Sequence, residues 1–296
     1  MRQVTETLTV RVPATSGNLG PGFDSMGMAH GIYDEVEATL LAGKTTVEIL
    51  GEGQGELPTD ESHLVVRALM RGFEFAGLPL AGVKMTCRNG ISQSRGLGSS
   101  AAAVVAGLTL AAGFLGRPDL FTKDDVLTIA TEFEGHPDNA APAIYGGAVV
   151  SWSEAGRSHA VSLDLHPELR TTLLVPKEVL ATATARAALP TSVPHVDAAF
   201  NASRTALLVH ALGHNLDLLH EATRDRLHQE YRSSSMPATA EVLDALRSAG
   251  WPAVVSGAGP AILVLDELDP QTCRILEARG FAVTTPGIGQ GAHIVA

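Results

Sequence analysis

The chain has 296 residues, of which 45% are hydrophobic and 18% charged, and this balance excludes a disordered protein. Its formal net charge of −11 argues against a nucleic-acid-binding protein, because such proteins carry a basic face. With only Cys87 and Cys273, neither a disulfide framework nor a thiolate zinc site is expected. The sequence has no signal-peptide core at its N-terminus and no apolar run of about 20 residues, so we expect a cytoplasmic protein.

In the first half of the chain, alternating polar and apolar residues predict strands, and apolar residues three or four positions apart predict helices. The helix expected at 99–115 is apolar nearly all round, so it should be buried. Asp124 and Asp125 stand in the first turn of another expected helix, where the helix dipole favours acidic side chains. We expect strands at 7–12, 35–41, 45–50, 81–87 and 146–152, and helices at 63–77, 99–115 and 123–135.

The second half mixes expected helices and strands without regular alternation, which predicts an α+β fold with helices on an antiparallel sheet. Residues 153–159 suit a turn or linker, and we therefore divide the chain into domains of residues 1–155 and 156–296. We expect strands at 169–176, 253–266 (interrupted by a glycine turn), 281–285 and 292–296, and helices at 182–190, 200–213, 238–250 and 273–280.

Residues 94–107, SRGLGSSAAAVVAG, join a glycine-rich turn to the buried helix. Gly96 and Gly98 let a ligand approach the main chain, and a helix start offers unpaired N–H groups with a partial positive charge. These features predict a phosphate-binding loop, although the segment has neither a Walker A motif nor the spacing of a dinucleotide fingerprint. They also suit an ordinary turn in which Ser99 caps the helix, and local chemistry leaves both interpretations open.

Two further stretches combine glycines with polar side chains. After a strand expected to end at Pro13, residues 14–27 form a loop with four glycines, Asn18 and Asp24. Such a loop suits either ligand binding or a structural turn in which the Asn and Asp bond their own backbone. Residues 254–265 predict a tight hairpin, in which Ser256 and backbone N–H groups could reach a nearby ligand.

The segment 132–147 ends a helix and gathers polar side chains in the turn that follows. Glu132 and Glu134 offer oxygen ligands, which Mg²⁺ prefers, whereas zinc would require further His or Cys at suitable spacing. His136 is followed by Asp138 and Asn139. By itself, His136 suits a hydrogen-bonding surface histidine better than a catalyst.

Taken in this order, the four stretches resemble the GHMP kinase superfamily, and PATSGNLGPGFDSMGMA and EGHPDNAAPAIYGG are similar to its homoserine kinase branch in particular. The resemblance covers nearly the whole chain. It implies the GHMP kinase fold, with an N-terminal nucleotide-binding domain like domain 2 of ribosomal protein S5 and a C-terminal ferredoxin-like α/β sandwich. It also implies phosphorylation of the L-homoserine hydroxyl by ATP with Mg²⁺, which gives O-phospho-L-homoserine for threonine biosynthesis. Neither a nucleic acid nor a membrane is an expected partner, and a homodimer is compatible with the family.

The resemblance also assigns roles to residues of the matching motifs. Ser100 and Glu134 fall where the family holds Mg²⁺, and with Asn139 they form the expected catalytic set. Asn139 stands where several relatives have an aspartate base, and since an amide cannot take the hydroxyl proton, we expect no side-chain base. Asp24 suits the substrate ammonium and an arginine fork its carboxylate. The expected substrate-binding residues are Asn18, Asp24, His136, Asn139, Arg186, Arg232 and Ser256; the expected phosphate loop is Ser92, Gln93, Ser94, Arg95, Gly96, Leu97, Gly98, Ser99, Ser100, Ala101 and Ala102.

The sequence departs from the family pattern at two positions and leaves two alternatives. Ser92 replaces a proline at the loop entry, and His63 stands where relatives often have Asn near the adenine, which leaves the nucleotide preference open. One alternative is another GHMP kinase, acting on mevalonate or a related alcohol; mevalonate has no ammonium for Asp24 to hold. The other is a catalytically silent ligand-binding relative, which typically lacks a metal ligand or part of the loop.

Overall fold

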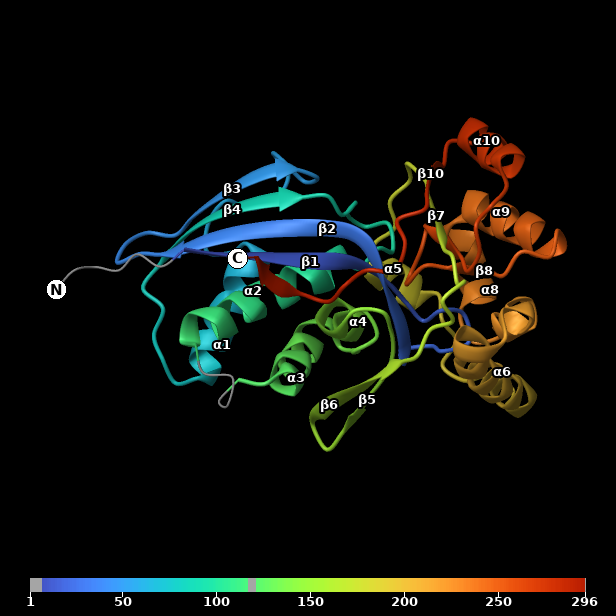
Figure 1. The fold of residues 1–296 in the computed structure, drawn as a ribbon, viewed down its shortest axis with the longest axis horizontal. Coiled ribbons are helices and arrows are strands. Elements are labelled where there is room, and N and C mark those ends of the chain that lie inside the picture. The colour runs from blue at the N-terminus through green and yellow to red at the C-terminus, as the bar shows by residue number, and fades with distance from the viewer. Residues whose placement is uncertain (1–6, 117–120, 296) are drawn as a thin grey trace.

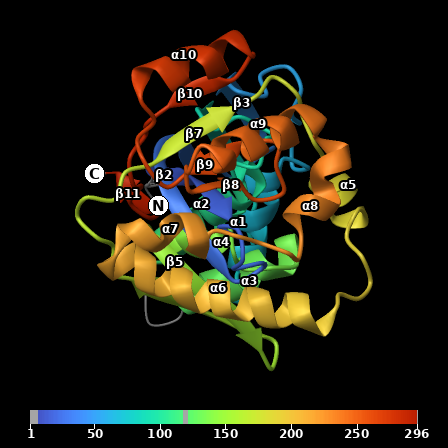
Figure 2. The same ribbon diagram turned by 90° about the vertical axis from the view of Figure 1, so that its right-hand side faces the viewer.

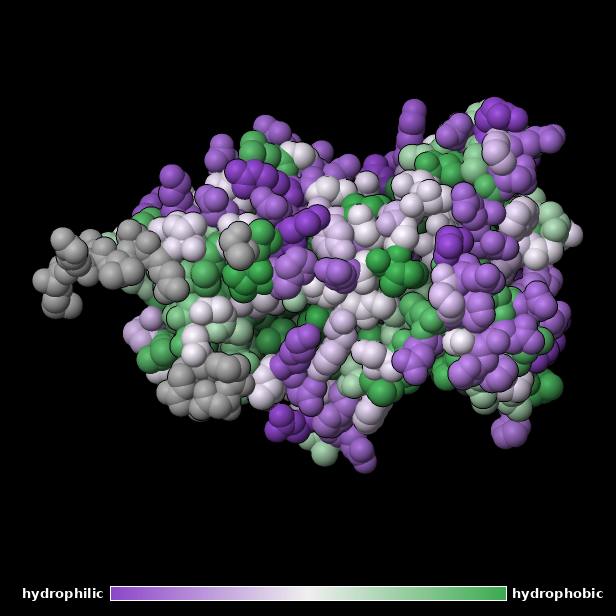
Figure 3. All heavy atoms as spheres, in the orientation of Figure 1, coloured by the Kyte–Doolittle hydropathy of each residue, from purple (hydrophilic) through white to green (hydrophobic). Residues whose placement is uncertain are grey.

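The computed structural model of the chain describes residues 7–116 and 121–295. These residues form two lobes side by side, and hydrophilic side chains are spread over both, with a paler band where the lobes meet (Figures 1 and 3). In the described parts of the chain, no helix is long and apolar enough to cross a membrane. The expected lack of a signal-peptide core concerns in part residues 1–6, which lie outside the described residues.

The first lobe is built on a seven-stranded sheet with the order β11-β1-β2-β4-β3, to which β5 adds beside β2 and β6 beside β5. The pair β3–β4 is parallel, because the chain crosses over through helix α1 between these strands, and the other pairs are antiparallel. The strands are β1 (Thr7–Gly17), β2 (Met26–Leu40), β3 (Thr46–Gly51), β4 (Val83–Asn89), β5 (Ala148–Glu154), β6 (Arg157–Leu163) and β11 (His293–Val295).

Four helices cover one side of this sheet (Figure 1). The central one begins at Ser99, as predicted, and its buried residues run from Ala101 to Ala111. A Cβ at Gly107 would lie 2.3 Å from the Val65 carbonyl oxygen, so this glycine allows two of the helices to pack closely. The helices are α1 (Leu64–Phe75), α2 (Ser99–Leu115), α3 (Lys123–Glu134) and α4 (Ala140–Tyr145).

The second lobe contains a four-stranded antiparallel sheet with the order β10-β7-β9-β8. Along the chain, the strands and helices follow the β-α-β-β-α-β pattern, which confirms the expected ferredoxin-like arrangement and the α+β class. In Figure 2, α6 runs along the lower edge of this lobe and α10 along its upper edge. The elements are β7 (Thr172–Val175), α5 (Thr182–Ala187), α6 (His195–His214), α7 (Leu219–Ala222), α8 (Gln229–Arg232), α9 (Pro237–Ser248), β8 (Ala253–Val255), β9 (Ile262–Val264), α10 (Pro270–Ala278) and β10 (Ala282–Thr284), with short 3-10 helices at Leu216–Leu218 and Ser233–Ser235.

In the first lobe, one sequence prediction is wrong and another is borne out in one of its two alternatives. The first strand does not end at Pro13 but continues to Gly17, because a register shift between Pro13 and Ala14 accommodates a residue that has no N–H to donate. Of the two alternatives for residues 153–159, the structure has the turn and not the linker, because these residues form the tip of the β5–β6 hairpin. Ala155 and Gly156 both have positive φ there, as a two-residue hairpin turn requires.

The position of the hairpin bears on the domain boundary. A division between residues 155 and 156 would separate β5 from β6, although the two strands pair along their whole length in the first sheet. We therefore propose a boundary after Leu163, with β11 returning from the C-terminus to pair with β1. One hydrophobic cluster also spans both lobes, since it joins Val10 and Leu69 to Leu208 and Leu263.

Candidate active site

A cavity of about 180 Å³ lies where the two lobes meet. Its walls combine the loop between β1 and β2, the start of α2, the turn after α3, and α5 and α8 from the second lobe. The lining residues are Asn18, Asp24, Ser94, Gly96, Leu97, Gly98, Ser99, Ser100, Glu134, His136, Asn139, Thr182, Arg186, Arg232, Gly257 and Ala258. The structure thus brings together side chains from all four glycine-rich stretches.

The start of α2 forms one wall of this cavity. Gly98, at φ +66°, is the N-cap and makes no side-chain capping bond, so Ser99 is not the helix cap. The first helical hydrogen bond runs from the Ala102 N–H to the Gly98 carbonyl. Within the described residues, the N–H groups of residues 99–101 therefore have no partner and can face an anion, which favours the phosphate-loop interpretation.

Close backbone contacts explain the two glycines of this loop. A Cβ at Gly96 would lie 2.2 Å from the Ser256 carbonyl oxygen, and a Cβ at Gly98 would lie 2.1 Å from Thr15 Oγ1. The fully buried Ser256 hydroxyl donates to the Gly96 carbonyl at 2.6 Å. Ser256, predicted to bind substrate, therefore supports the phosphate loop from behind and does not line the cavity.

A second cavity of about 300 Å³ adjoins the first and shares Ser94, Ser99 and Ser100 with it. Apolar side chains line much of the remainder, and such a lining suits the flat ring of a nucleotide base. His63 also lines this cavity. The buried His63 Nδ1 has no hydrogen-bond partner in the described part of the chain. The apolar lining residues are Val36, Leu57, Pro58, Leu64, Val65, Ala102, Ala103 and Ala106.

Of the remaining residues predicted for the phosphate loop, some line the second cavity and others lie in the protein interior. Gln93 and Ala102 line the second cavity. Ser92 donates to Glu52 at 3.3 Å, Ala101 is buried, and neither lines either of the two cavities. Arg95 does not line either cavity, because its guanidinium donates to the carbonyls of Pro176 and Lys177. It therefore fastens the loop to the second lobe.

Ser100 and Glu134 form the oxygen pair on which a metal site could be built. The Ser100 hydroxyl donates to Glu134 Oε2 at 3.0 Å, and burial raises the pKa of the Glu134 carboxyl. Glu132, the other candidate magnesium ligand, instead pairs with Arg71 at 3.1 Å outside the cavity. Of the two acids, only Glu134 faces the cavity.

The turn after α3 carries three polar residues with different orientations. Asp138 is 1% exposed and does not line the cavity; its carboxylate accepts from His136 Nδ1 at 2.5 Å and from the Asn18 N–H at 3.1 Å. Burial opposes protonation of His136, but the hydrogen bond and charge of Asp138 outweigh it and raise the pKa of the ring. Asn139 lines the cavity and accepts from Thr15 Oγ1 at 3.1 Å.

The end of the cavity that the second cavity does not share holds both signs of charge. Arg186 donates to the two oxygens of Asp24 at 2.7 and 3.3 Å, and the Asp24 N–H donates to Asn18 Oδ1 at 3.0 Å. Arg232 is 2% exposed, and both guanidinium groups lie near the Phe23 ring, at 5.8 Å for Arg186 and 5.6 Å for Arg232. One possible metal-ligand atom from each of Asp24, His136 and Asp138 lies within 4.8 Å of the other two. We assign no metal to this group, because Arg186 already pairs with Asp24.

Sequence reasoning missed several residues around this end. Thr182, Gly257 and Ala258 line the cavity, although sequence reasoning named only Arg186 near the first and only Ser256 in the 254–265 hairpin that contains the other two. His228, whose ring contacts Arg232, precedes it by four residues on a helical turn. That spacing puts both side chains on one face and is the signal that could have identified His228.

Comparison with known proteins gives consistent matches along the chain. The GHMP kinases N terminal domain matches residues 63–147, and the GHMP kinases C terminal domain matches residues 204–272. The homoserine kinase of Mycolicibacterium vanbaalenii is 50% identical over 294 residues, covering 96% of this chain and 94% of that protein. The homoserine kinase of Corynebacterium efficiens is 49% identical over 277 residues, covering 91% and 89%.

Solved structures give the same picture. A homoserine kinase from Cytophaga hutchinsonii has a TM-score of 0.86 and 26% identity, covering 100% of this chain and 99% of that chain. A mevalonate diphosphate decarboxylase from Staphylococcus aureus covers both chains completely, with a TM-score of 0.69 and 15% identity. This second likeness concerns the fold alone.

Proposed function

Because the chain belongs to the GHMP kinases, with homoserine kinases as relatives at about 50% identity, we propose that ATP phosphorylates L-homoserine in the cavity between the lobes. The function is that of a homoserine kinase, an ATP-dependent phosphotransferase with an alcohol acceptor. Its product, O-phospho-L-homoserine, belongs to threonine biosynthesis. The fold is the GHMP kinase fold that the sequence motifs predict.

The observation that carries the assignment of the cavity is its two chemically different ends. At one end, the unpaired N–H groups of α2 and its dipole favour the phosphates of ATP. At the other, Asp24 suits the ammonium of an amino acid, and Arg186 and Arg232 suit its carboxylate. With both charged groups held, the substrate hydroxyl can point towards the γ-phosphate, and such positioning supplies most of what phosphoryl transfer requires.

We propose Ser100 and Glu134 as the ligands of Mg²⁺. Both offer oxygen, the donor that Mg²⁺ prefers, and they lie 3.0 Å apart at the end of the cavity that holds the N–H groups. When bound, Mg²⁺ neutralises charge on the phosphates.

We propose further that no side chain acts as the base. Asn139 is the residue that faces the cavity, and its amide cannot take a proton at neutral pH. The neighbouring Asp138 has an ionisable group, but both its oxygens bond to His136 and Asn18. The hydroxyl proton therefore leaves to the γ-phosphate or to solvent.

The experiment that tests the function is a coupled ADP-release assay with Mg-ATP and L-homoserine, mevalonate or shikimate as acceptor. We expect turnover of L-homoserine only, because the other two have no ammonium to pair with Asp24. Activity on mevalonate but not on homoserine would overturn the assignment. Nucleotide binding without turnover of any acceptor would instead favour a silent relative, although Ser100, Glu134 and the whole GLGSSA segment are present.

The cellular setting follows from the substrates. We propose that the enzyme acts in the cytoplasm, where ATP is available. The homodimer stays a prediction, which analytical ultracentrifugation of the purified chain would test.

A further inference from the structure

Arg232 is held by three acceptors that leave one of its nitrogen atoms for the cavity. Its Nε donates to the Ala185 carbonyl at 3.2 Å, and its Nη1 donates to His228 Nδ1 at 3.1 Å and to the Gly257 carbonyl at 3.3 Å. Its Nη2 makes no hydrogen bond within the described residues, and Arg232 lines the cavity. The guanidinium is thus fixed on one side and available on the other.

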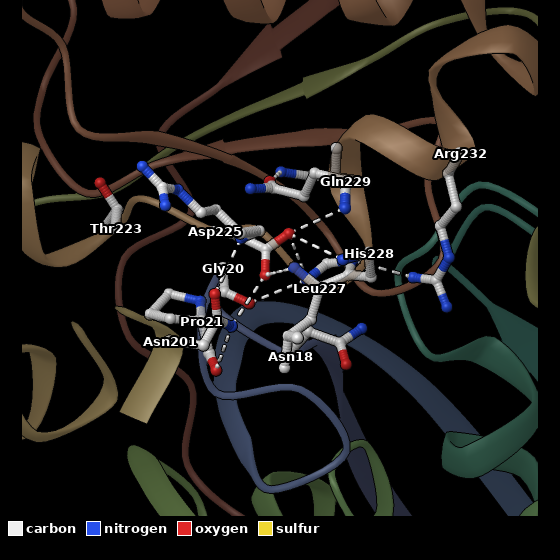
Figure 4. Close-up of polar contacts among 12 residues, drawn as sticks. Asn18, Gly20, Pro21, Asn201, Thr223, Asp225, Leu227, His228, Gln229 and Arg232 are labelled. Carbon is white, nitrogen blue, oxygen red and sulfur yellow. Dashed lines mark hydrogen bonds and ion pairs between the residues drawn. The ribbon is translucent and has the colours of Figure 1, made fainter. Parts of the chain in front are cut away.

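The tautomer of His228 follows from its two neighbours (Figure 4). Its Nε2 lies 2.8 Å from the Gly20 carbonyl oxygen, which can only accept a hydrogen bond. Nε2 therefore carries the proton, and Nδ1 presents a lone pair to Arg232. A doubly protonated ring would set an N–H against an N–H of the guanidinium.

We propose that His228 is a positioning residue of the phosphotransfer reaction, whose Nδ1 lone pair aims the Arg232 guanidinium at the substrate carboxylate. The inference rests on the proposed function, because it takes the carboxylate of homoserine as the ligand of Arg232. His228 itself is fully buried and lines neither of the two cavities.

Asp225 fixes the turn that carries His228 (Figure 4). Its carboxylate accepts from the N–H groups of Leu227, His228 and Gln229 at 3.0, 3.0 and 2.8 Å. Asn201 Nδ2 donates to the same carboxylate at 3.0 Å. These bonds fasten the start of α8, so the position of the His228 ring is set by backbone groups.

His228 also joins the two halves of the substrate end. Its bond to Gly20 holds the loop that carries Asn18 and Asp24, and its ring stacks on Phe23 with 5.2 Å between the ring centroids. Burial lowers the pKa of the His228 ring and the neighbouring Arg232 lowers it further, whereas Asp225 acts in the opposite direction. The net lowering agrees with the neutral tautomer that the geometry requires.

Two substitutions separate the two bonds of the ring. His228→Asn keeps an acceptor near the place of Nδ1 and loses the donor to Gly20, whereas His228→Gln keeps a donor near Nε2 and loses the acceptor for Arg232. We expect His228→Gln to raise KM for L-homoserine about 10-fold, since a misplaced charged hydrogen bond costs about that factor, with KM for ATP within about 2-fold. His228→Asn, which keeps the acceptor for Arg232, should raise KM for L-homoserine by no more than about 3-fold, and we attribute that smaller rise to the lost bond to Gly20.

A substrate without a carboxylate makes the test specific. On 3-aminopropan-1-ol, which has the ammonium and hydroxyl but no carboxylate, His228→Gln and the unmodified chain should have equal kcat/KM. An equal loss on both substrates, or an unchanged KM for homoserine, would overturn the inference, and melting curves of both variants show whether the fold is intact. No turnover of homoserine by the unmodified chain would instead refute the proposed function, and the inference with it.

Discussion

At the scale of single residues, Asp138 and Asn139 show how neighbours in sequence acquire different tasks. The ionisable side chain is turned inward to His136 and the Asn18 N–H, while the amide faces the cavity. A buried carboxylate that accepts two hydrogen bonds organises the groups around it. We therefore assign Asp138 to the placement of His136 and Asn18.

This assignment predicts the kinetics of Asp138→Asn. The amide can accept only one of the two hydrogen bonds, so KM for homoserine should rise about 10-fold, equivalent to about 1.4 kcal/mol, with kcat within about 3-fold. Steady-state kinetics with Glu132→Gln as a control, a change at an exposed pair outside the cavity, checks the result. A loss of kcat of about 10²-fold with unchanged KM would make Asp138 a general base.

At the same scale, some site residues can be predicted from the sequence and others cannot. The resemblance of short motifs to a kinase family predicts Ser100, Glu134 and Asn139 as site residues, and all three line the same cavity. The sequence gives no sign that Asp24 pairs with Arg186, since 162 positions separate them. Ser256 has the right chemistry for a ligand, and only the fold shows that its hydroxyl is taken by the Gly96 carbonyl.

At the scale of elements, the junction of the phosphate loop with α2 depends on close backbone approach. Gly96 has φ +78° and would bring a Cβ within 2.2 Å of the Ser256 carbonyl oxygen, so neither backbone can yield easily. Gly77, after α1, has a similar φ of +71° but nothing within 4 Å of its Cβ position. The two glycines therefore separate the effect of conformation from the effect of crowding.

We predict that Gly77→Ala costs about 1 kcal/mol of stability through its left-handed conformation and leaves the kinetics unchanged. Gly96→Ala must also move the loop away from residue 256, so KM for ATP should rise at least about 10-fold. Thermal unfolding of both variants measures the loss of stability, and steady-state kinetics measure their KM for ATP. A Gly96→Ala enzyme with the ATP kinetics of the unmodified chain would contradict the role assigned to the contact.

Asp34 of β2 gives an element-scale prediction on pH. Burial raises the pKa of its carboxyl to about 6, although the N–H groups of Ile91 and Gly90 act to lower it. The folded chain therefore binds this proton more tightly than the unfolded chain, and stability should fall by about 3 kcal/mol as pH rises from about 4 through 6.

Asp34→Asn should abolish this pH-dependent loss of stability, because the amide does not ionise. The fold should be kept, since both N–H groups bond to Oδ1, an acceptor that Asn retains. Urea unfolding between pH 4.5 and 7 should show that the free energy of unfolding of the variant rises relative to that of the unmodified chain as pH increases. The exposed Asp164→Asn is the matched control. Parallel pH profiles for Asp34→Asn and the unmodified chain would refute the argument.

At the scale of the whole molecule, the two lobes share structure as well as a cavity. A hydrophobic cluster contains residues of both, and β11 returns from the second lobe to pair with β1, so that this last strand belongs to the first sheet (Figure 1). The amphipathic patterns predict most strands and helices. They cannot predict this return, because three residues of strand have no local signal that selects a partner nearly 290 positions away.

We predict a single cooperative unfolding transition, with equal calorimetric and van't Hoff enthalpies. Removing residues 285–296 should lower the melting temperature by about 5 °C or more, because β1 loses its partner strand and exposes an edge. Differential scanning calorimetry of both chains checks this. Two resolved transitions in the full chain would show that the lobes unfold independently.

The ion pair between Asp24 and Arg186 has a consequence for selectivity. A simple amine that displaced Arg186 from Asp24 would strand the guanidinium without a counter-charge, and a simple carboxylic acid would strand the aspartate in the same way. Only a zwitterion can replace both halves of the pair at once. The ion pair thus occupies the places of the two charged groups of the substrate, and it lowers the affinity for singly charged molecules without excluding them.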